Sequence, residues 1–143
     1  MPRILALDYG TARIGVAISD ETGTIASPLC VVDVAEGREL GELAAIIERE
    51  RVECVVVGLP RRLAGDEGPA AQAVRAFIAA LSERLSVPVV TWDERMTTAQ
   101  AERAMIAGGA RREQRRGRID KVAAAVMLQS YLDAQGAKGS EDG

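Results

Sequence analysis

Three acidic residues lie far apart in the sequence, each at a place where a carboxylate can do chemistry. Asp8 ends the first apolar run, Glu94 follows a later apolar run, and Asp120 lies at the start of the last amphipathic stretch. Acids that converge repel one another unless a cation holds them, and carboxylate oxygens suit hard cations such as Mg²⁺ or Mn²⁺. Two such ions about 4 Å apart can hydrolyse a phosphodiester bond. The sequence therefore predicts a site for one or two divalent ions, built from these three acids.

The absence of histidine narrows the chemistry further. None of the 143 residues is histidine, which excludes a Ser-His-Asp triad, a Cys-His nucleophile and a His-ligated zinc ion. Cys30 and Cys54 lie in separate apolar runs, and we interpret them as buried side chains in a reducing compartment. Carboxylates, Lys and Arg, hydroxyls, thiols and backbone groups remain as the means of catalysis.

Basic residues gather next to the third acid. The net charge of −3 argues against binding nucleic acid through bulk charge, but it leaves room for a local basic patch. Arginine binds phosphate through a planar fork, so this cluster favours contact with a nucleic-acid backbone; the alternative is a solubilising surface loop. The candidate nucleic-acid-binding residues are Arg13, Arg61, Arg62, Arg95, Arg111, Arg112, Arg115, Arg116, Arg118 and Lys121.

The hydrophobic pattern predicts the strands and helices that position these residues. Two strands within residues 4–20 and a third at 25–34 are joined by short turns, so they form an antiparallel meander. In the later part of the chain, helices and strands alternate, and this order favours right-handed crossovers and a parallel part of the sheet. These later elements are a helix at 38–51, a strand at 52–58, a helix that includes 74–85, a strand at 87–92, a helix at about 97–107, a polar, arginine-rich loop at 110–118 and a last helix at about 119–134. The inward face of this last helix is expected to include Val122, Ala123 and Val126.

The expected fold is an α/β fold, with a five-stranded mixed sheet of order 3-2-1-4-5 flanked by helices. Ligands bind such sheets outside the carboxyl ends of parallel strands, and Asp8 and Glu94 both fall there. Asp120 lies in the first turn of the last helix, which we expect to begin beside them. Each acid also has a simpler explanation, as a turn former, a solvated turn residue or an acid favoured by the helix dipole. Their joint placement favours one shared site.

The composition predicts one domain and an aliphatic core. Aromatic residues make up only 3% of the chain, so Val, Leu, Ile and Ala must fill the interior. We expect residues 1–135 to form this domain and residues 136–143 to be a disordered tail. Met1 and Pro2 lead directly into a strand, and no apolar run approaches the roughly 20 residues that cross a bilayer. The sequence thus predicts a cytoplasmic protein with no membrane partner.

Several motifs, spread over nearly the whole chain, resemble those of one known family. The chain is similar to the YqgF (RuvX) family, the pre-ribosomal-RNA nucleases and Holliday-junction-resolvase-like proteins of bacteria. The matching segments are Asp8-Tyr9-Gly10-Thr11-Ala12-Arg13-Ile14-Gly15-Val16-Ala17, Gly58-Leu59-Pro60 with Gly65 and Glu67-Gly68-Pro69, Asp93-Glu94-Arg95-Met96-Thr97-Thr98, Asp120-Lys121-Val122-Ala123-Ala124-Ala125 and Leu128-Gln129-Ser130-Tyr131-Leu132.

The resemblance implies a fold, a site and a substrate. The fold is RNase H-like, in agreement with the topology expected above, and the metal-binding catalytic set is Asp8, Glu94 and Asp120. The implied function is a metal-dependent nuclease that matures the 5′ end of pre-16S rRNA, a structured RNA, with Mg²⁺ or Mn²⁺. Related nucleases often use a fourth acid, for which Asp93 and Asp20 are the candidates here.

Other functions fit the same residues. A Holliday-junction-resolvase-like nuclease would cut branched DNA, or single-stranded DNA, and symmetric incision of a junction needs a dimer; the sequence leaves monomer and homodimer open. A non-catalytic nucleic-acid-binding factor in transcription or ribosome assembly would keep the acids without using them. The turn after Asp8 also resembles the first phosphate loop of the actin and sugar-kinase superfamily, but that superfamily places its nucleotide between two such domains.

Overall fold

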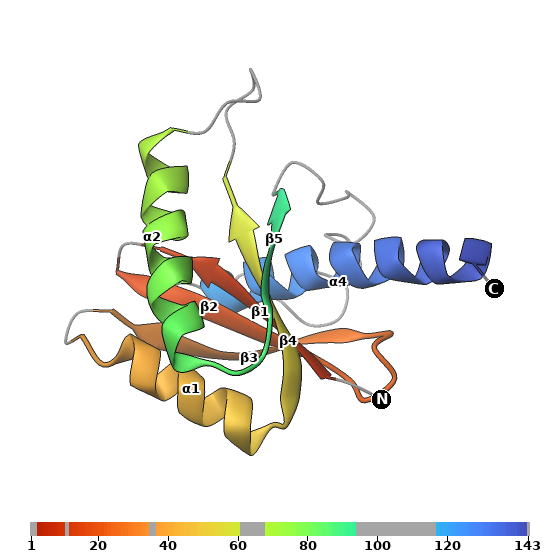
Figure 1. Cartoon of the computed structure of the whole chain (residues 1–143), viewed down its shortest axis with the longest axis horizontal. Helices are drawn as coiled ribbons and strands as arrows, with labels where there is room; N and C mark the ends of the chain where they lie inside the picture. Colours follow the sequence, from red (N-terminus) through yellow and green to blue (C-terminus); the bar gives the residue numbers. More distant parts are fainter. Residues whose placement is uncertain (1–2, 11, 35–36, 61–67, 94–116, 143) are drawn as a thin grey trace.

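A five-stranded mixed sheet forms the centre of the molecule (Figure 1). The computed structural model describes residues 3–10, 12–34, 37–60, 68–93 and 117–142, and within the last range it describes the side chains of residues 121–136. The strand order is β3-β2-β1-β4-β5, which confirms the predicted order. The strands are β1 (Arg3–Tyr9), β2 (Arg13–Ser19), β3 (Ala26–Asp33), β4 (Val52–Leu59) and β5 (Val89–Asp93).

The strand directions bring three carboxyl ends to one edge of the sheet. Strand β1 pairs antiparallel with β2, which pairs antiparallel with β3. On its other side β1 pairs parallel with β4, and β4 pairs parallel with β5. The ends of β1, β4 and β5 therefore share the edge at which open α/β sheets bind ligands. We call it the carboxyl edge.

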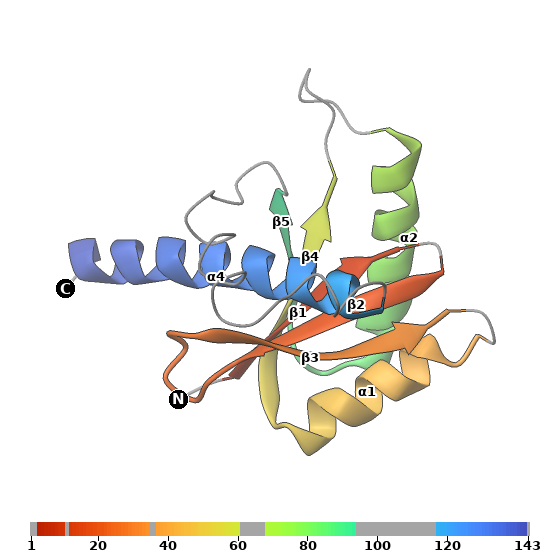
Figure 2. The same ribbon diagram turned by 180° about the vertical axis from the view of Figure 1, so that it is seen from behind.

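Helices cover both faces of the sheet. Helices α1 (Glu39–Arg49) and α2 (Pro69–Arg84) lie on one face, and α4 (Gly117–Asp142) lies on the other (Figures 1 and 2). The predicted helix at 97–107 and the predicted loop at 110–118 fall almost wholly outside the described residues. The sheet is thus the middle of three layers, as expected for an α/β fold with right-handed crossovers.

The two faces of the sheet have different side chains. On the side of α1 and α2, Leu5 and Leu7 belong to a core of large aliphatic residues. On the side of α4, alternation along β1 presents Ala6, which packs in a second cluster with Ala124 and Ala125. These alanines are fully buried. Small residues on both surfaces allow the axis of α4 to lie close to the sheet.

Helix α4 differs from its prediction in two respects. Ala123, expected to face inward, is exposed, and Ala124 takes the buried position instead. The helix also continues to Asp142, across the stretch 136–142 where we expected a disordered tail. No proline interrupts this stretch, and a helix that has already formed can lengthen by one hydrogen bond per residue. Gly136, the first residue of the expected tail, therefore lies inside the helix.

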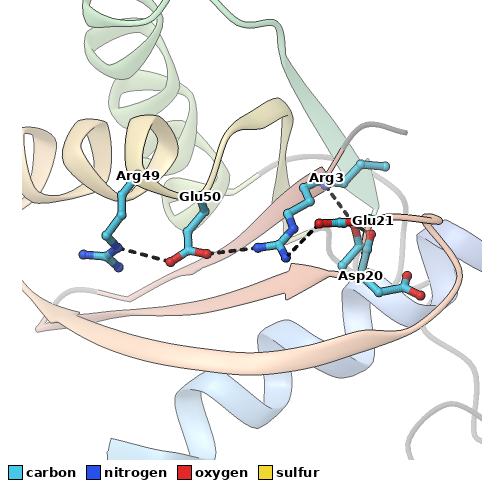
Figure 3. A network of polar contacts seen from close by, with 7 residues as sticks. Arg3, Asp20, Glu21, Arg49 and Glu50 are labelled. Atoms are coloured by element: carbon cyan, nitrogen blue, oxygen red, sulfur yellow. Dashed lines mark hydrogen bonds and ion pairs between the residues drawn. The ribbon is translucent and has the colours of Figure 1, made fainter.

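A polar network joins the elements at the edge of the sheet opposite the carboxyl edge (Figure 3). Glu50, just after α1, accepts hydrogen bonds from Arg3 Nη1 at 3.0 Å and from Arg49 Nε at 3.1 Å. The Ile4 N–H donates to Ser19 Oγ at 2.9 Å, and this hydroxyl donates to the Asp20 carbonyl oxygen at 3.1 Å. The ion pairs are partly exposed and contribute little each, whereas the buried Ser19 hydroxyl keeps a backbone N–H paired at the start of β1.

Candidate active site at the carboxyl edge

Asp8 lies at the carboxyl edge, on the face that α4 covers. Its neighbour Leu7 belongs to the core under α1 and α2, so alternation directs the half-buried Asp8 side chain to the opposite face. Across the sheet Asp8 pairs with Gly15 of β2. On the other side the next residue in register is Gly58 of β4, since Leu7 pairs with Val57. Neither flanking residue has a side chain, so the two neighbouring strand positions add no bulk beside this carboxylate.

The turn that follows Asp8 has room only for glycine. The Gly10 N–H donates to the Arg13 carbonyl oxygen at 2.9 Å. A Cβ on Gly10 would lie 2.7 Å from that same oxygen, closer than Cβ atoms approach a backbone oxygen. This turn joins β1 to β2 and so holds Asp8 and Arg13 at the same edge.

We therefore expect Gly10→Ala to destabilise the protein by about 1–3 kcal/mol, because the backbone of the turn must shift to relieve the contact. Gly136→Ala is the matched control. Its Cβ would meet nothing within 4 Å, and alanine within a helix is favoured over glycine by roughly 0.5–1 kcal/mol. Urea denaturation measures both changes; equal stability of the two variants would contradict the assigned turn geometry.

For Asp120 the structure describes only the backbone, and Glu94 lies outside the described residues. Asp120 lies in the first turn of α4, on the same side of the sheet as the Asp8 side chain. That helix begins on the side of the molecule where β1 ends (Figure 2). Glu94 follows directly after Asp93, the last residue of β5, and lies outside the described residues, as does the side chain of Asp120. Among the residues that are described, no three acids, cysteines or histidines form a group able to hold a metal ion.

Some of the candidate nucleic-acid-binding residues are described by the structure, and the others are not. Arg13 is exposed at the start of β2, next to the turn after Asp8. Lys121 is half-buried one residue after Asp120. Arg118 lies in the first turn of α4 with its side chain outside the description. The remaining candidates lie outside the described residues, namely Arg61, Arg62, Arg95, Arg111, Arg112, Arg115 and Arg116.

The two candidates for a fourth acid lie in different surroundings from Asp8. Asp93 is at the carboxyl edge, but it pairs with Leu59, a member of the core on the α1 and α2 side. Its side chain therefore starts from the opposite face. Asp20 follows β2 at the other edge of the sheet, where its carboxylate organises a turn. Its Oδ1 accepts the N–H groups of Thr24 and Ile25 at 2.8 and 3.0 Å.

The Asp20 turn has a measurable pH dependence. The Thr22 hydroxyl, 2.6 Å from Oδ2, and the two backbone N–H groups lower the pKa of Asp20 from 3.8 to about 2. A pKa that is depressed in the folded state adds stability above pH 3.8, and this stability is lost as the pH falls towards about 2. We expect Asp20→Asn to be less stable than the wild type at pH 7 and to match it near pH 2 in chemical denaturation. A difference that does not change with pH would contradict this.

One contact near the site was not evident in the sequence. Trp92 of β5 and Tyr131 of α4 meet edge to face, with ring centroids 5.4 Å apart and an interplanar angle of 90°. Within the described residues the buried Trp92 Nε1 has no hydrogen-bond partner. Burial raises the pKa of the Tyr131 phenol, and the nearby Cys54 thiol adds to this shift. Alternation along β5, the strand that leads to Glu94, is the sequence signal that could have placed Trp92 on the same face as Asp8.

Comparison with known proteins decides the family. Residues 2–134 match the RuvX family, described as Holliday junction resolvase. The chain belongs to the RuvX family. A relative from Geobacillus thermodenitrificans (strain NG80-2), named "Putative pre-16S rRNA nuclease", is 48% identical over 136 residues, which cover 93% of this chain and 99% of the relative. A relative of the same name from Lactococcus lactis subsp. cremoris (strain SK11) is 46% identical over 139 residues, 95% of this chain and 97% of that protein.

Solved structures confirm the fold of this RuvX-family chain. Thermus thermophilus RuvC in complex with a Holliday junction substrate superposes with a TM-score of 0.60, at 17% identity, over 94% of this chain and 96% of that one. A second Thermus thermophilus RuvC structure gives a TM-score of 0.55. The expected RNase H-like fold is therefore correct. No described helix is both long and apolar enough to span a membrane.

Proposed function

We propose that this RuvX-family chain is a divalent-metal-dependent nuclease that hydrolyses phosphodiester bonds at the 5′ end of pre-16S rRNA. One observation carries the proposal: the Asp8 carboxylate lies at the carboxyl edge between two glycines, on the face covered by the helix that contains Asp120. Family membership and the names of relatives 46% and 48% identical to the chain support the same activity and substrate.

The residues at this edge fit a divalent cation. Asp8 offers carboxylate oxygens, the ligands that Mg²⁺ and Mn²⁺ prefer, and its neighbours in register on β2 and β4 are the glycines Gly15 and Gly58, which add no side chain of their own. We propose that Glu94 and Asp120 complete a set of ligands for one or two ions. When bound, such ions make water a better nucleophile and neutralise charge on the leaving oxygen. In the protein, the three acids hold the ions and the buried strand β1 fixes the position of Asp8.

Basic residues are proposed to hold the nucleic-acid backbone. Arg13 is exposed at the same edge as Asp8, where its guanidinium can reach a phosphate of a strand bound across the site. The arginines between 111 and 118 precede Asp120 along the chain, and we propose that they bind phosphates beyond the cleaved bond. In a chain of net charge −3, affinity must come from this local cluster.

Replacing Arg115 and Arg116 together by Ala tests this role. If both side chains bind phosphates, we expect weaker RNA binding. The plot of the logarithm of the binding constant against the logarithm of the salt concentration should also be less steep by roughly 1.4, about 0.7 for each contact to a single strand. Binding titrations at a series of KCl concentrations measure the slope. An unchanged slope in a folded variant would mean that Arg115 and Arg116 do not bind phosphates and only make the protein more soluble.

A cleavage assay on three substrates tests the activity itself. A pre-16S rRNA fragment, an unstructured RNA and a DNA four-way junction are incubated side by side with Mg²⁺, with Mn²⁺ or with EDTA. We expect metal-dependent cleavage of the rRNA fragment at its 5′ end. Preference for the four-way junction would instead favour the second candidate function, junction resolution, which the description of the family supports. That function requires two active sites and hence a dimer, which sedimentation detects.

A further inference from the structure

The two ends of the proposed site are anchored on different halves of the sheet. Helix α4, which contains Asp120, packs mainly on β2 and β3 and to a lesser extent on β1. Among the described strands, β5, which leads to Glu94, pairs with β4 alone and forms the opposite margin of the sheet. Twist between neighbouring strands accumulates across a sheet. The relative position of α4 and β5 is therefore not fixed by the packing of α4 alone.

The contact between Trp92 and Tyr131 joins these two halves on the face of the site. Trp92 lies two residues before Glu94, and it pairs with Gly58, the residue that flanks Asp8 on β4. Two strand spacings separate Trp92 from Asp8, about 10 Å along one row of the sheet. Both rings pack against the apolar cluster between α4 and the sheet. The aromatic pair thus bridges β5 and α4, the two elements that lead to Glu94 and contain Asp120, with Tyr131 eleven residues after Asp120 on the helix.

We propose that Trp92 and Tyr131 are positioning residues, whose edge-to-face contact fixes the end of β5 relative to α4 and thereby the separation of Glu94 and Asp120. The inference rests on the proposed function, because it concerns the acids assigned to the metal site. Groups that hydrogen-bond metal ligands and so orient them typically change metal affinity or activity by 10–100-fold when they are replaced, and for a pair that acts through packing we expect the lower end of this range. Aromatic rings suit this role since they are rigid and their edge contacts have a defined geometry.

The indole N–H of Trp92 indicates that ring packing, and not a hydrogen bond, positions β5 against α4. Within the described residues the indole Nε1 of Trp92 is buried without a partner, so the indole ring is held by packing and by the edge of its neighbour. Phenylalanine at either position would keep a ring at the contact, whereas leucine would keep apolar volume and lose the ring. The comparison of Leu with Phe at one position therefore separates geometry from burial.

The test measures metal binding and turnover of the full chain. For Tyr131→Leu we expect about tenfold weaker Mn²⁺ binding by calorimetry without nucleic acid, and a lower kcat on the rRNA fragment with unchanged KM. Tyr131→Phe should retain the wild-type values. Leu132→Val is the matched control, because Leu132 is buried on the same helix outside the ring contact. It should lower stability without weakening Mn²⁺ binding. If Tyr131→Leu does not fold, Trp92→Leu against Trp92→Phe gives the same comparison.

The outcomes separate this inference from the proposed function. Mn²⁺ binding that Asp8→Asn does not weaken would overturn the metal site, and the positioning role with it. Mn²⁺ binding that depends on Asp8 but is equal in the wild type and in folded Tyr131→Leu, with equal kcat, would overturn the positioning role alone. Equal losses in Tyr131→Leu and Leu132→Val would assign the effect to general destabilisation and would also overturn it.

Discussion

Asp8→Asn is expected to lower the rate of RNA cleavage by about 100-fold or more while leaving RNA affinity nearly unchanged. The amide has the shape of the carboxylate but lacks its charge, so a ligand proposed for the divalent cations is lost. RNA affinity depends instead on basic residues that contact phosphates. Single-turnover cleavage of the pre-16S rRNA fragment and a binding titration on the same RNA measure the two quantities separately.

Asp20→Asn provides the matched control for this variant. It makes the same chemical change at the opposite edge of the sheet, where the carboxylate organises a turn, and it should cleave at the wild-type rate under conditions in which it is folded. Cleavage by Asp8→Asn at the wild-type rate would refute the assigned active site. A cell in which Asp8→Asn supports normal ribosome maturation would favour the non-catalytic binding factor over the nuclease.

Ala124→Leu is expected to have the second large effect, a loss of up to about 3 kcal/mol in the free energy of unfolding. Ala124 is fully buried in the cluster where α4 packs on Ala6 and Ala17. Three additional carbon atoms fit there only if the helix moves away from the sheet. Because that helix contains Asp120, cleavage should fall as well. The midpoint of urea denaturation should decrease at an unchanged m-value.

The neighbouring residue offers a control on the same helix. Ala123 is exposed, so Ala123→Leu should change the free energy of unfolding by no more than about 0.5 kcal/mol. Equal losses at both positions would mean that the helix is not seated on the sheet through its buried alanine. A stable Ala124→Leu variant with normal cleavage would show that close packing of α4 is not needed for the site.

The sheet could be predicted because its determinants are local in the sequence. Short turns after Tyr9 and Asp20 require antiparallel neighbours, and the helices that precede β4 and β5 require parallel crossovers. Asp8 could be assigned to a ligand-binding edge for the same reason, since it ends a central strand. These rules depend on chain connectivity and alternation, and a single sequence contains both.

Other features depend on contacts between distant residues, which a single sequence does not encode locally. The periodicity of α4 did not distinguish Ala123 from Ala124, because consecutive alanines give no hydrophobic contrast. The meeting of Trp92 with Tyr131 depends on how α4 crosses the sheet. Asp93 and Asp20 could not be separated as candidates for a fourth acid until the register assigned Asp93 to the face opposite Asp8 and the turn contacts assigned Asp20 to the other edge. The convergence of Glu94 and Asp120 on Asp8 stays a prediction.

The position of Trp92 has a practical consequence for studying this enzyme. It is the only tryptophan in the chain, and it lies beside the carboxyl edge in contact with Tyr131. Indole fluorescence excited where tyrosine does not absorb therefore arises from this one location. If Mn²⁺ binds at the proposed site, its paramagnetic quenching of this fluorescence would report ion occupancy in real time and without an attached dye.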